Sequence, residues 1–108
     1  MTDQVPEVDL ETVAAALGDG AVLVDVREPY EYEAGHVPGA RLVPLSEIQG
    51  RLAEIPKGRP VYVICAVGQR SYAAAAWLRR NGVDAISVAD GTEGWAADGR
   101  PIETGAAS

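Results

Sequence analysis

The sequence predicts an α/β domain in which helices cover both faces of a mostly parallel sheet. Three observations lead to this fold class. Short apolar runs without polar alternation recur along the chain, as expected of strands that are buried on both faces. Segments with apolar residues at helical spacing separate these runs, and glycine or proline marks most of the boundaries. Strands that alternate with helices favour parallel pairing, with the helices packed on the two faces of the sheet.

The first helix is predicted to begin after Asp9, whose side chain can cap it, and to end at Gly18 and Gly20. Its apolar residues fall on one helical face: Leu10, Val13, Ala14 and Leu17. Residues 21–26 follow as a short apolar run without alternation. This run predicts the first buried strand.

The next segment is short and rich in turns. Pro29 suits the first turn of a short helix that runs through Tyr32, because proline has no N–H to leave unpaired there. Residues 35–40 contain two glycines and a proline, which predicts a turn. A brief strand over residues 41–43 is expected to follow.

A helix is predicted over residues 46–55. Ser46 and Gln49 have the spacing of a capping box, in which each side chain bonds the backbone of the other residue. Its expected buried side carries Ile48, Leu52 and Ile55. Residues 56–60 contain two prolines and a glycine, and we expect a turn there.

The second half repeats the alternation of strand and helix. Residues 61–64 predict a buried strand that ends directly before Cys65. An alanine-rich segment predicts a helix from Ser71 to Arg80. Residues 85–88 predict a third buried strand, and residues 89–95 predict a glycine-rich loop that enters a last short helix.

A chain of 108 residues is expected to form one domain, with a core over about residues 8–102 and short flexible tails at both ends. The formal net charge is −7, from 16 acidic and 9 basic residues, so we expect neither nucleic acid nor anionic membranes as partners. No apolar run approaches the about 20 residues that span a bilayer. The polar, acidic start of the chain is unlike a signal peptide, so a cytoplasmic location is predicted.

Cys65 is the only cysteine, and the chain has one histidine. An internal disulfide and an ordinary structural zinc site are therefore excluded, and no metal ligands are predicted. Two interpretations of Cys65 remain. It is either a small hydrophobic residue that ends a buried strand, or a reactive thiol.

The loop after Cys65 favours the reactive interpretation. It lies at the carboxyl end of a parallel strand, where active sites of α/β folds form. Gly68 permits a tight turn in which successive backbone N–H groups converge on an anion, and Arg70 adds a permanent positive charge. Such surroundings stabilise a thiolate. The residues predicted to surround a bound sulfur anion are Ala66, Val67, Gly68, Gln69, Arg70 and Ser71.

Four segments in succession resemble the signatures of the rhodanese family, and the resemblance covers about residues 8–102. They are residues 23–32, with Asp25, Arg27 and Glu31 among them; residues 35–40; the loop from Cys65 to Arg70; and residues 90–102 with Asp90, Gly91 and Trp95. One segment alone would be weak evidence. Their common order and spacing make the resemblance specific.

The resemblance implies a three-layer α/β/α domain and a ping-pong sulfur transfer. The Cys65 thiolate would take the sulfane sulfur of a donor such as thiosulfate, and cyanide or a thiol would then remove it from the Cys65 persulfide. Backbone N–H groups from Ala66 to Ser71 would hold the anion, and no cofactor is implied. With no second cysteine to receive the sulfur, an outside acceptor is needed, such as a sulfur-relay protein.

Two supporting residues precede the loop in the chain. Asp25 is expected to bond loop backbone or to pair with Arg27, since a carboxylate beside a thiolate would oppose its ionisation. Arg27 is expected to anchor the segment that follows it or to steer anions toward Cys65. His36 is predicted to bond backbone in a packed turn rather than to act as a base.

Two alternative functions are weighed against sulfur transfer. A non-catalytic regulatory or sulfur-carrier binding module could use the same fold, although the presence of Cys65, Gly68 and Arg70 argues against it. Related phosphatases and arsenate reductases have a longer loop, with one more residue between cysteine and arginine. Four residues separate Cys65 from Arg70, which fits a smaller ligand than phosphate.

Overall fold

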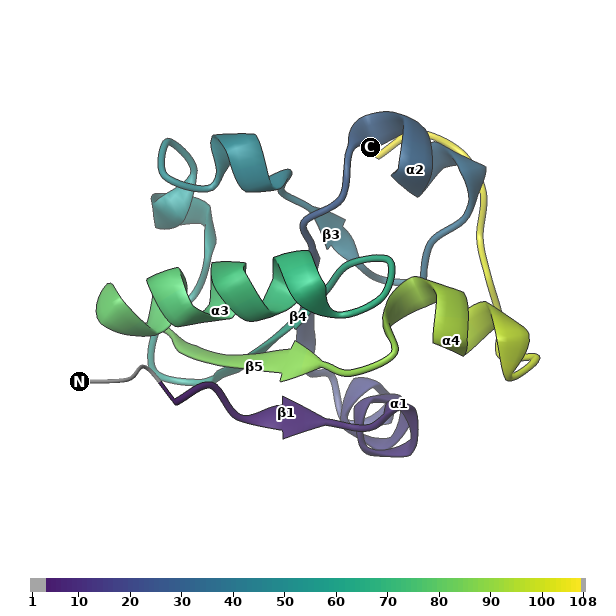
Figure 1. Ribbon diagram of the computed structural model, residues 1–108, viewed down its shortest axis with the longest axis horizontal. Helices are drawn as coiled ribbons and strands as arrows, with labels where there is room; N and C mark the ends of the chain where they lie inside the picture. The colour runs from purple at the N-terminus through teal and green to yellow at the C-terminus, as the bar shows by residue number, and fades with distance from the viewer. Residues whose placement is uncertain (1–3, 108) are drawn as a thin grey trace.

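The computed structural model describes residues 4–107, and a five-stranded parallel sheet forms its centre (Figure 1). The strand order is β1-β5-β4-β2-β3, and every pairing is parallel. The strands are β1 (Glu7–Val8), β2 (Val22–Asp25), β3 (Arg41–Leu42), β4 (Pro60–Ile64) and β5 (Asp84–Val88). The predicted parallel sheet is thus confirmed.

Helices cover both faces of this sheet. They are α1 (Leu10–Gly18), α2 (Pro29–Ala34), α3 (Gln69–Arg80) and α4 (Gly91–Ala97). On one face, buried residues of α3 and of segment 45–55 pack against alternate residues of β2 and β4. On the other face, α1, α2 and α4 contribute Leu10, Val13, Tyr32 and Trp95 to a second cluster. The three predicted α/β/α layers are confirmed.

Local signals placed the first two helices correctly. The Asp9 side chain accepts a hydrogen bond from the Thr12 N–H at 2.8 Å and caps α1. Pro29 occupies the first turn of α2, as predicted, and Glu31 closes a capping box with Glu28. Both caps satisfy N–H groups that a helix start leaves without partners.

The predicted helix over residues 46–55 is wrong. The structure has two short 3₁₀ turns there, Leu45–Glu47 and Leu52–Glu54, and no side chain caps the first of them. Gly50 lies between the turns and disfavours a continuous helix, because glycine has the most backbone freedom to lose. The burial prediction still holds for Ile48 and Ile55, and Leu52 packs against the same cluster.

Other boundaries differ from the prediction. α3 begins at Gln69, so Ser71 lies inside the first turn of the helix rather than at its start. The edge strand β1 was not predicted, because two residues show no periodicity. Val5, outside the predicted core, is buried in the cluster beneath α3.

The segment after Ile102, predicted to be a flexible tail, has backbone bonds to the end of α2. His36 and Glu103 exchange two backbone hydrogen bonds, and the Gly105 N–H donates to the Glu33 carbonyl. The ends of the predicted tails, residues 1–3 and 108, lie outside the described residues. No helix in residues 4–107 is both long and apolar enough to cross a membrane.

Candidate active site

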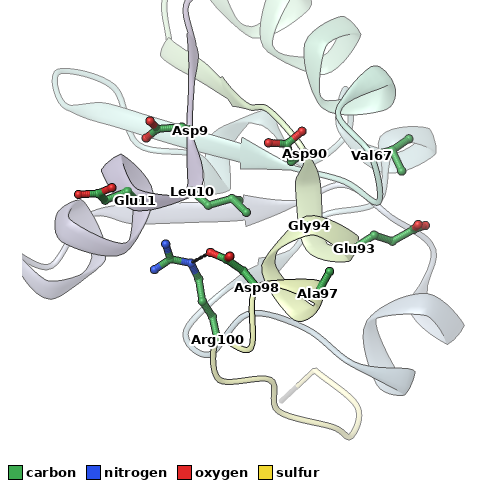
Figure 2. Close-up of a pocket in the computed structure, with 10 residues that line it drawn as sticks. All are labelled: Asp9, Leu10, Glu11, Val67, Asp90, Glu93, Gly94, Ala97, Asp98 and Arg100. Atoms are coloured by element: carbon green, nitrogen blue, oxygen red, sulfur yellow. Dashed lines mark hydrogen bonds and ion pairs between the residues drawn. The ribbon is translucent and has the colours of Figure 1, made fainter.

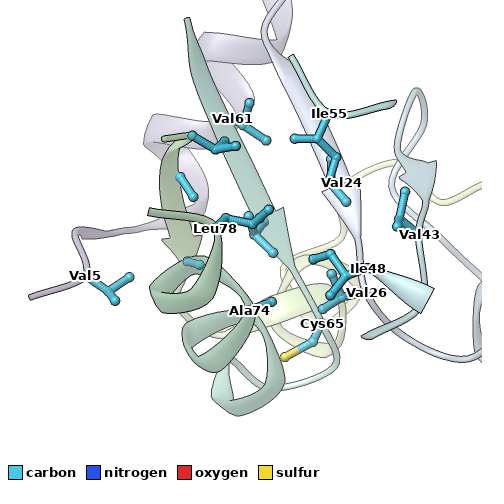
Figure 3. Close-up of a cluster of buried hydrophobic side chains, with 14 residues drawn as sticks. Val5, Val24, Val26, Val43, Ile48, Ile55, Val61, Cys65, Ala74 and Leu78 are labelled. Atoms are coloured by element: carbon cyan, nitrogen blue, oxygen red, sulfur yellow. The ribbon is translucent and has the colours of Figure 1, made fainter. Parts of the chain in front are cut away.

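Cys65 follows the last residue of β4, at the edge where the carboxyl ends of the strands meet. Asp25 at the end of β2 is in register with Ile64, and β5 ends beside β4. Figure 3 shows Cys65 at one end of the core cluster, with its sulfur directed toward the first turns of α3. The sheet therefore places the thiol where ligand sites of α/β folds form.

The Cys65 sulfur lies inside the turn made by the following residues. The Gly68 N–H donates to Sγ at 3.1 Å, and the Ser71 Oγ lies 3.5 Å from Sγ. Gly68 has a φ of 104°, a left-handed conformation that favours glycine, and it is the N-cap of α3. The residue as a whole is only 1% exposed. The sulfur is therefore held beneath the loop rather than at its tip.

The surroundings of Cys65 lower the pKa of its thiol. Burial is the largest single influence and acts in the opposite direction, because it disfavours the charged form. The Ser71 hydroxyl and backbone N–H lower the pKa, as do the N–H groups of Gly68 and Val67. Together these hydrogen bonds outweigh burial, so the pKa of Cys65 lies below the usual cysteine value. The loop favours a nucleophilic thiolate.

A second buried hydroxyl, that of Ser87, is hydrogen-bonded to the Ser71 hydroxyl. The Ser71 and Ser87 Oγ atoms are 2.9 Å apart, and both residues are fully buried. With Cys65 as a thiol, its S–H donates to Ser71, whose own hydroxyl donates to the Gly68 carbonyl at 3.2 Å. With Cys65 ionised, the Ser71 hydroxyl can turn to the sulfur while Ser87 donates to Ser71. Ser87 on β5 thus keeps the Ser71 oxygen hydrogen-bonded while Ser71 donates to a thiolate.

We expect Ser71→Ala to raise the pKa of Cys65, because the substitution removes a hydroxyl that hydrogen-bonds the sulfur and favours its charged form. The pH midpoint of iodoacetamide alkylation measures the shift, with the exposed Ser46→Ala as the matched control. A midpoint equal to that of the parent protein would contradict a role for the Ser71 hydroxyl.

The start of α4 holds the loop from the other side. The Thr92 N–H donates to the Cys65 carbonyl at 2.8 Å, and the Glu93 N–H donates to the Ala66 carbonyl at 3.0 Å. Gly91 has a φ of 60°, and a Cβ atom at this position would overlap the Ala66 carbonyl. Glycine is therefore required where α4 approaches the loop backbone.

Arg70 is bonded to a carboxylate of α2. Its two terminal nitrogens donate to the two oxygens of Glu31 at 2.8 and 2.9 Å, a bidentate pair. The Arg70 guanidinium lowers the pKa of Glu31 to about 2, against the opposing effect of burial. Glu31 in turn raises the pKa of Arg70 further above its already high value. The pair ties the start of α3 to α2.

The low pKa of Glu31 defines the pH range in which the Glu31–Arg70 ion pair stabilises the protein. A carboxyl group whose pKa is depressed on folding stabilises the protein above its unfolded-state pKa, about 4.3 for glutamate. We therefore expect the loss of unfolding free energy in Glu31→Gln to be largest near neutral pH and to shrink from about pH 4.3 toward pH 2. Urea unfolding across this range measures it, with the exposed Glu33→Gln as the control. A pH-independent difference would contradict the ion pair.

Asp25 and Arg27 form a buried ion pair. The Arg27 Nη2 lies 2.9 Å from Asp25 Oδ2 and donates to the Gly35 carbonyl at 2.8 Å. The Asp25 carboxylate also accepts the Arg27 backbone N–H at 3.0 Å. Asp25 thus pairs with Arg27, and Arg27 also bonds the segment that follows it, through the Gly35 carbonyl. His36 bonds backbone as predicted, through Nδ1 and the Tyr32 carbonyl at 2.7 Å.

The structure brings the predicted loop residues together around the sulfur but gives them different surroundings. Gly68 and Ser71 contact Sγ, Val67 and Gln69 are exposed, and Arg70 is turned to Glu31. The assignment of these residues to substrate binding stays a prediction. Three contributions were not predicted: Glu31, Ser87 and the N–H groups at the start of α4. Within residues 4–107 no group of acidic, histidine or cysteine side chains is placed to hold a metal ion.

Comparison with known proteins adds independent findings. Residues 9–98 match the family described as the Rhodanese-like domain. A sulfurtransferase of Allochromatium vinosum is 39% identical over 101 residues, which cover 91% of this chain and 94% of that protein. A putative sulfur carrier protein of Bacillus subtilis is 35% identical over 84% of this chain and 51% of its own length. The crystal structure of a rhodanese-related protein from Thermoplasma volcanium has a TM-score of 0.85, at 26% identity, covering 91% of this chain and 97% of that one.

Proposed function

The chain belongs to the rhodanese-like domain family, and from this membership we propose that it is a sulfurtransferase that acts through a persulfide on Cys65. It takes a sulfane sulfur from a donor such as thiosulfate and passes it to cyanide or a thiol. Because Cys65 is the only cysteine of the chain, the acceptor is an outside molecule.

The reaction has two balanced steps. The Cys65 thiolate attacks the outer sulfur of thiosulfate, the S–S bond of the donor breaks, and sulfite leaves with its electron pair. Cys65 then carries one additional sulfur as a persulfide anion. Cyanide attacks that outer sulfur, thiocyanate leaves, and the Cys65 thiolate is restored. The donor gives up one sulfur atom and the acceptor receives it, so the enzyme needs no external oxidant or reductant.

The observation that carries this proposal is the hydrogen bonding of the Cys65 sulfur. The Gly68 N–H and the Ser71 hydroxyl lie 3.1 and 3.5 Å from Sγ, and the bonds around the sulfur lower the pKa of the thiol. Donors fixed in place around a developing anion stabilise it without reorganising. The same groups suit the negative charge of a persulfide after the transfer.

Phosphate chemistry fits this loop less well. Four residues separate Cys65 from Arg70, and both ends of the Arg70 guanidinium are bonded to Glu31. A phosphate site of this kind needs an arginine fork free to bind two oxygens. The paired guanidinium therefore argues against a phosphate site.

A non-catalytic sulfur carrier is the second candidate, because a similar Bacillus subtilis protein is named a putative sulfur carrier. The two functions differ in turnover. An enzyme releases thiocyanate many times per molecule, whereas a carrier takes up one sulfur and retains it until a partner accepts it.

Steady-state thiocyanate formation tests the proposal. Initial rates measured over a matrix of donor and cyanide concentrations are expected to give the parallel double-reciprocal lines of a ping-pong reaction. Cys65→Ser is expected to have no activity, while Ser46→Ala retains the activity of the parent. Activity that survives in Cys65→Ser would refute the proposal, and a single turnover without release would favour the carrier.

A further inference from the structure

We propose that the sulfur donor of this protein is a cysteine persulfide on a positively charged protein surface, rather than a free anion such as thiosulfate. The inference rests on the proposed function and names the class of donor for the same site. Three observations support it: the pairing of the nearby cations, an acidic hollow beside the loop, and exposed apolar side chains around the loop.

The cations near the loop are occupied by carboxylates. Three ion pairs show this: Arg27 with Asp25, Arg70 with Glu31, and Arg100 with Asp98. The first is buried, and the second is bidentate with its carboxylate only 20% exposed. To bind a doubly charged anion, these arginines would first have to give up their present partners. The loop therefore offers thiosulfate backbone N–H groups but little attraction by charge.

An acidic hollow of about 670 Å³ lies directly beside the loop (Figure 2). Val67 of the loop forms part of its wall, with residues from the start of α1, from α4 and from the segment after α4. Its acidic side chains are Asp9, Glu11, Asp90, Glu93 and Asp98, against the single cation Arg100. Within residues 4–107 no ion pair engages Glu11, Asp90 or Glu93. This surface repels anionic donors and attracts cationic ones.

The large apolar side chains that are exposed in the described part of the chain gather at the loop. They are Tyr30 (73% exposed), Val67 (55%) and Tyr72 (38%). Tyr30 precedes Glu31, the partner of Arg70, and Tyr72 lies in the first turn of α3. Tyrosine is enriched in protein interfaces, and exposed apolar groups gathered at one site mark interaction surfaces.

These features fit one kind of occupant. A basic protein can contact the apolar side chains while its lysines or arginines face the hollow. The cysteine persulfide of that protein then contacts the buried Cys65 sulfur. In the transfer, the Cys65 thiolate attacks the terminal sulfur of R–S–SH, the S–S bond breaks, and the donor leaves as the thiolate R–S⁻. Cys65 becomes Cys65–S–SH, and no oxidant or reductant is consumed.

Synthetic peptides test the charge preference directly. Three peptides carry one cysteine persulfide each and differ only in flanking residues, which are lysine, glutamine or glutamate. Rapid-quench intact mass gives the rate at which each peptide adds one sulfur to the protein. We expect the lysine peptide to react at least about tenfold faster than the glutamate peptide at low salt, with the ratio falling as ionic strength rises.

Charge-reversal variants locate the preference on the protein. Glu93→Lys and Glu11→Lys change exposed residues of the hollow, and the double variant is expected to abolish the ratio between the two peptides. Asp19→Lys makes the same charge change after the last turn of α1, at the far end of the sheet, and is expected to keep the ratio. Equal rates with all three peptides, or a ratio unchanged in the double variant, would overturn the inference while leaving the proposed function intact. If no donor, thiosulfate included, adds sulfur to Cys65, the proposed function itself fails.

Discussion

Gly91→Ala is expected to destabilise the protein by about 2–5 kcal/mol and to remove most sulfur transfer. Gly91 has a positive φ, and a side chain there would overlap the Ala66 carbonyl. A left-handed conformation costs a residue with a side chain about 1–2 kcal/mol, and overpacking typically adds about 1–3 kcal/mol. The overlap would push α4 away from the loop. The hydrogen bonds from α4 to the Cys65 and Ala66 carbonyls would then be lost.

Gly20→Ala is the matched control for this prediction. Gly20 also has a positive φ, 82°, but a Cβ atom there would meet nothing within 4 Å. In Gly20→Ala we therefore expect only the conformational cost of about 1–2 kcal/mol, with no overlap and an intact loop. Urea unfolding and the transfer rate are measured for both variants. Equal losses of unfolding free energy in the two variants would contradict the close contact between Gly91 and the Ala66 backbone.

Arg70→Ala is expected to reduce sulfur transfer by about tenfold to a hundredfold while the protein stays folded. The substitution releases the start of α3 from α2 and leaves the Glu31 carboxylate without its bidentate partner. Small displacements of catalytic groups can reduce rates by about a hundredfold, whereas a partly exposed ion pair adds only about 1 kcal/mol to stability.

Two further variants separate the charge of Arg70 from its geometry. Arg70→Lys keeps the charge but cannot bond both Glu31 oxygens in the same plane, so we expect it to recover only part of the rate. Glu31→Gln removes the partner of Arg70 and is expected to lower the transfer rate, as Arg70→Ala does. Transfer kinetics in Arg70→Ala equal to those of the parent would contradict the role of the pair.

Much of the architecture follows from local sequence patterns. The buried strands lack polar alternation, and Asp9 and Pro29 mark the starts of helices, so sheet and layers could be predicted. The helix predicted over residues 46–55 failed although its buried positions were right. A spacing of three or four residues also fits successive 3₁₀ turns, and Gly50 between them favours the break.

The site could be predicted in part for the same reason. Cys65 and Gly68 lie close together in the chain, so the turn around the sulfur is a local property of the loop. Glu31 and Arg70 lie 39 residues apart, and Ser71 and Ser87 lie 16 apart. No local signal connects such residues. Their contacts depend on how α2 and β5 are placed next to α3 by the whole sheet.

We propose that Cys65 carries sulfur as a persulfide, and intact mass measures this directly. The parent protein and Cys65→Ser are incubated separately with thiosulfate and with a lysine-flanked peptide persulfide, and cyanide is then added. We expect one additional sulfur on the parent alone from at least the peptide donor, and we expect cyanide to remove it with formation of thiocyanate. No added sulfur from either donor, or the same addition on Cys65→Ser, would contradict it.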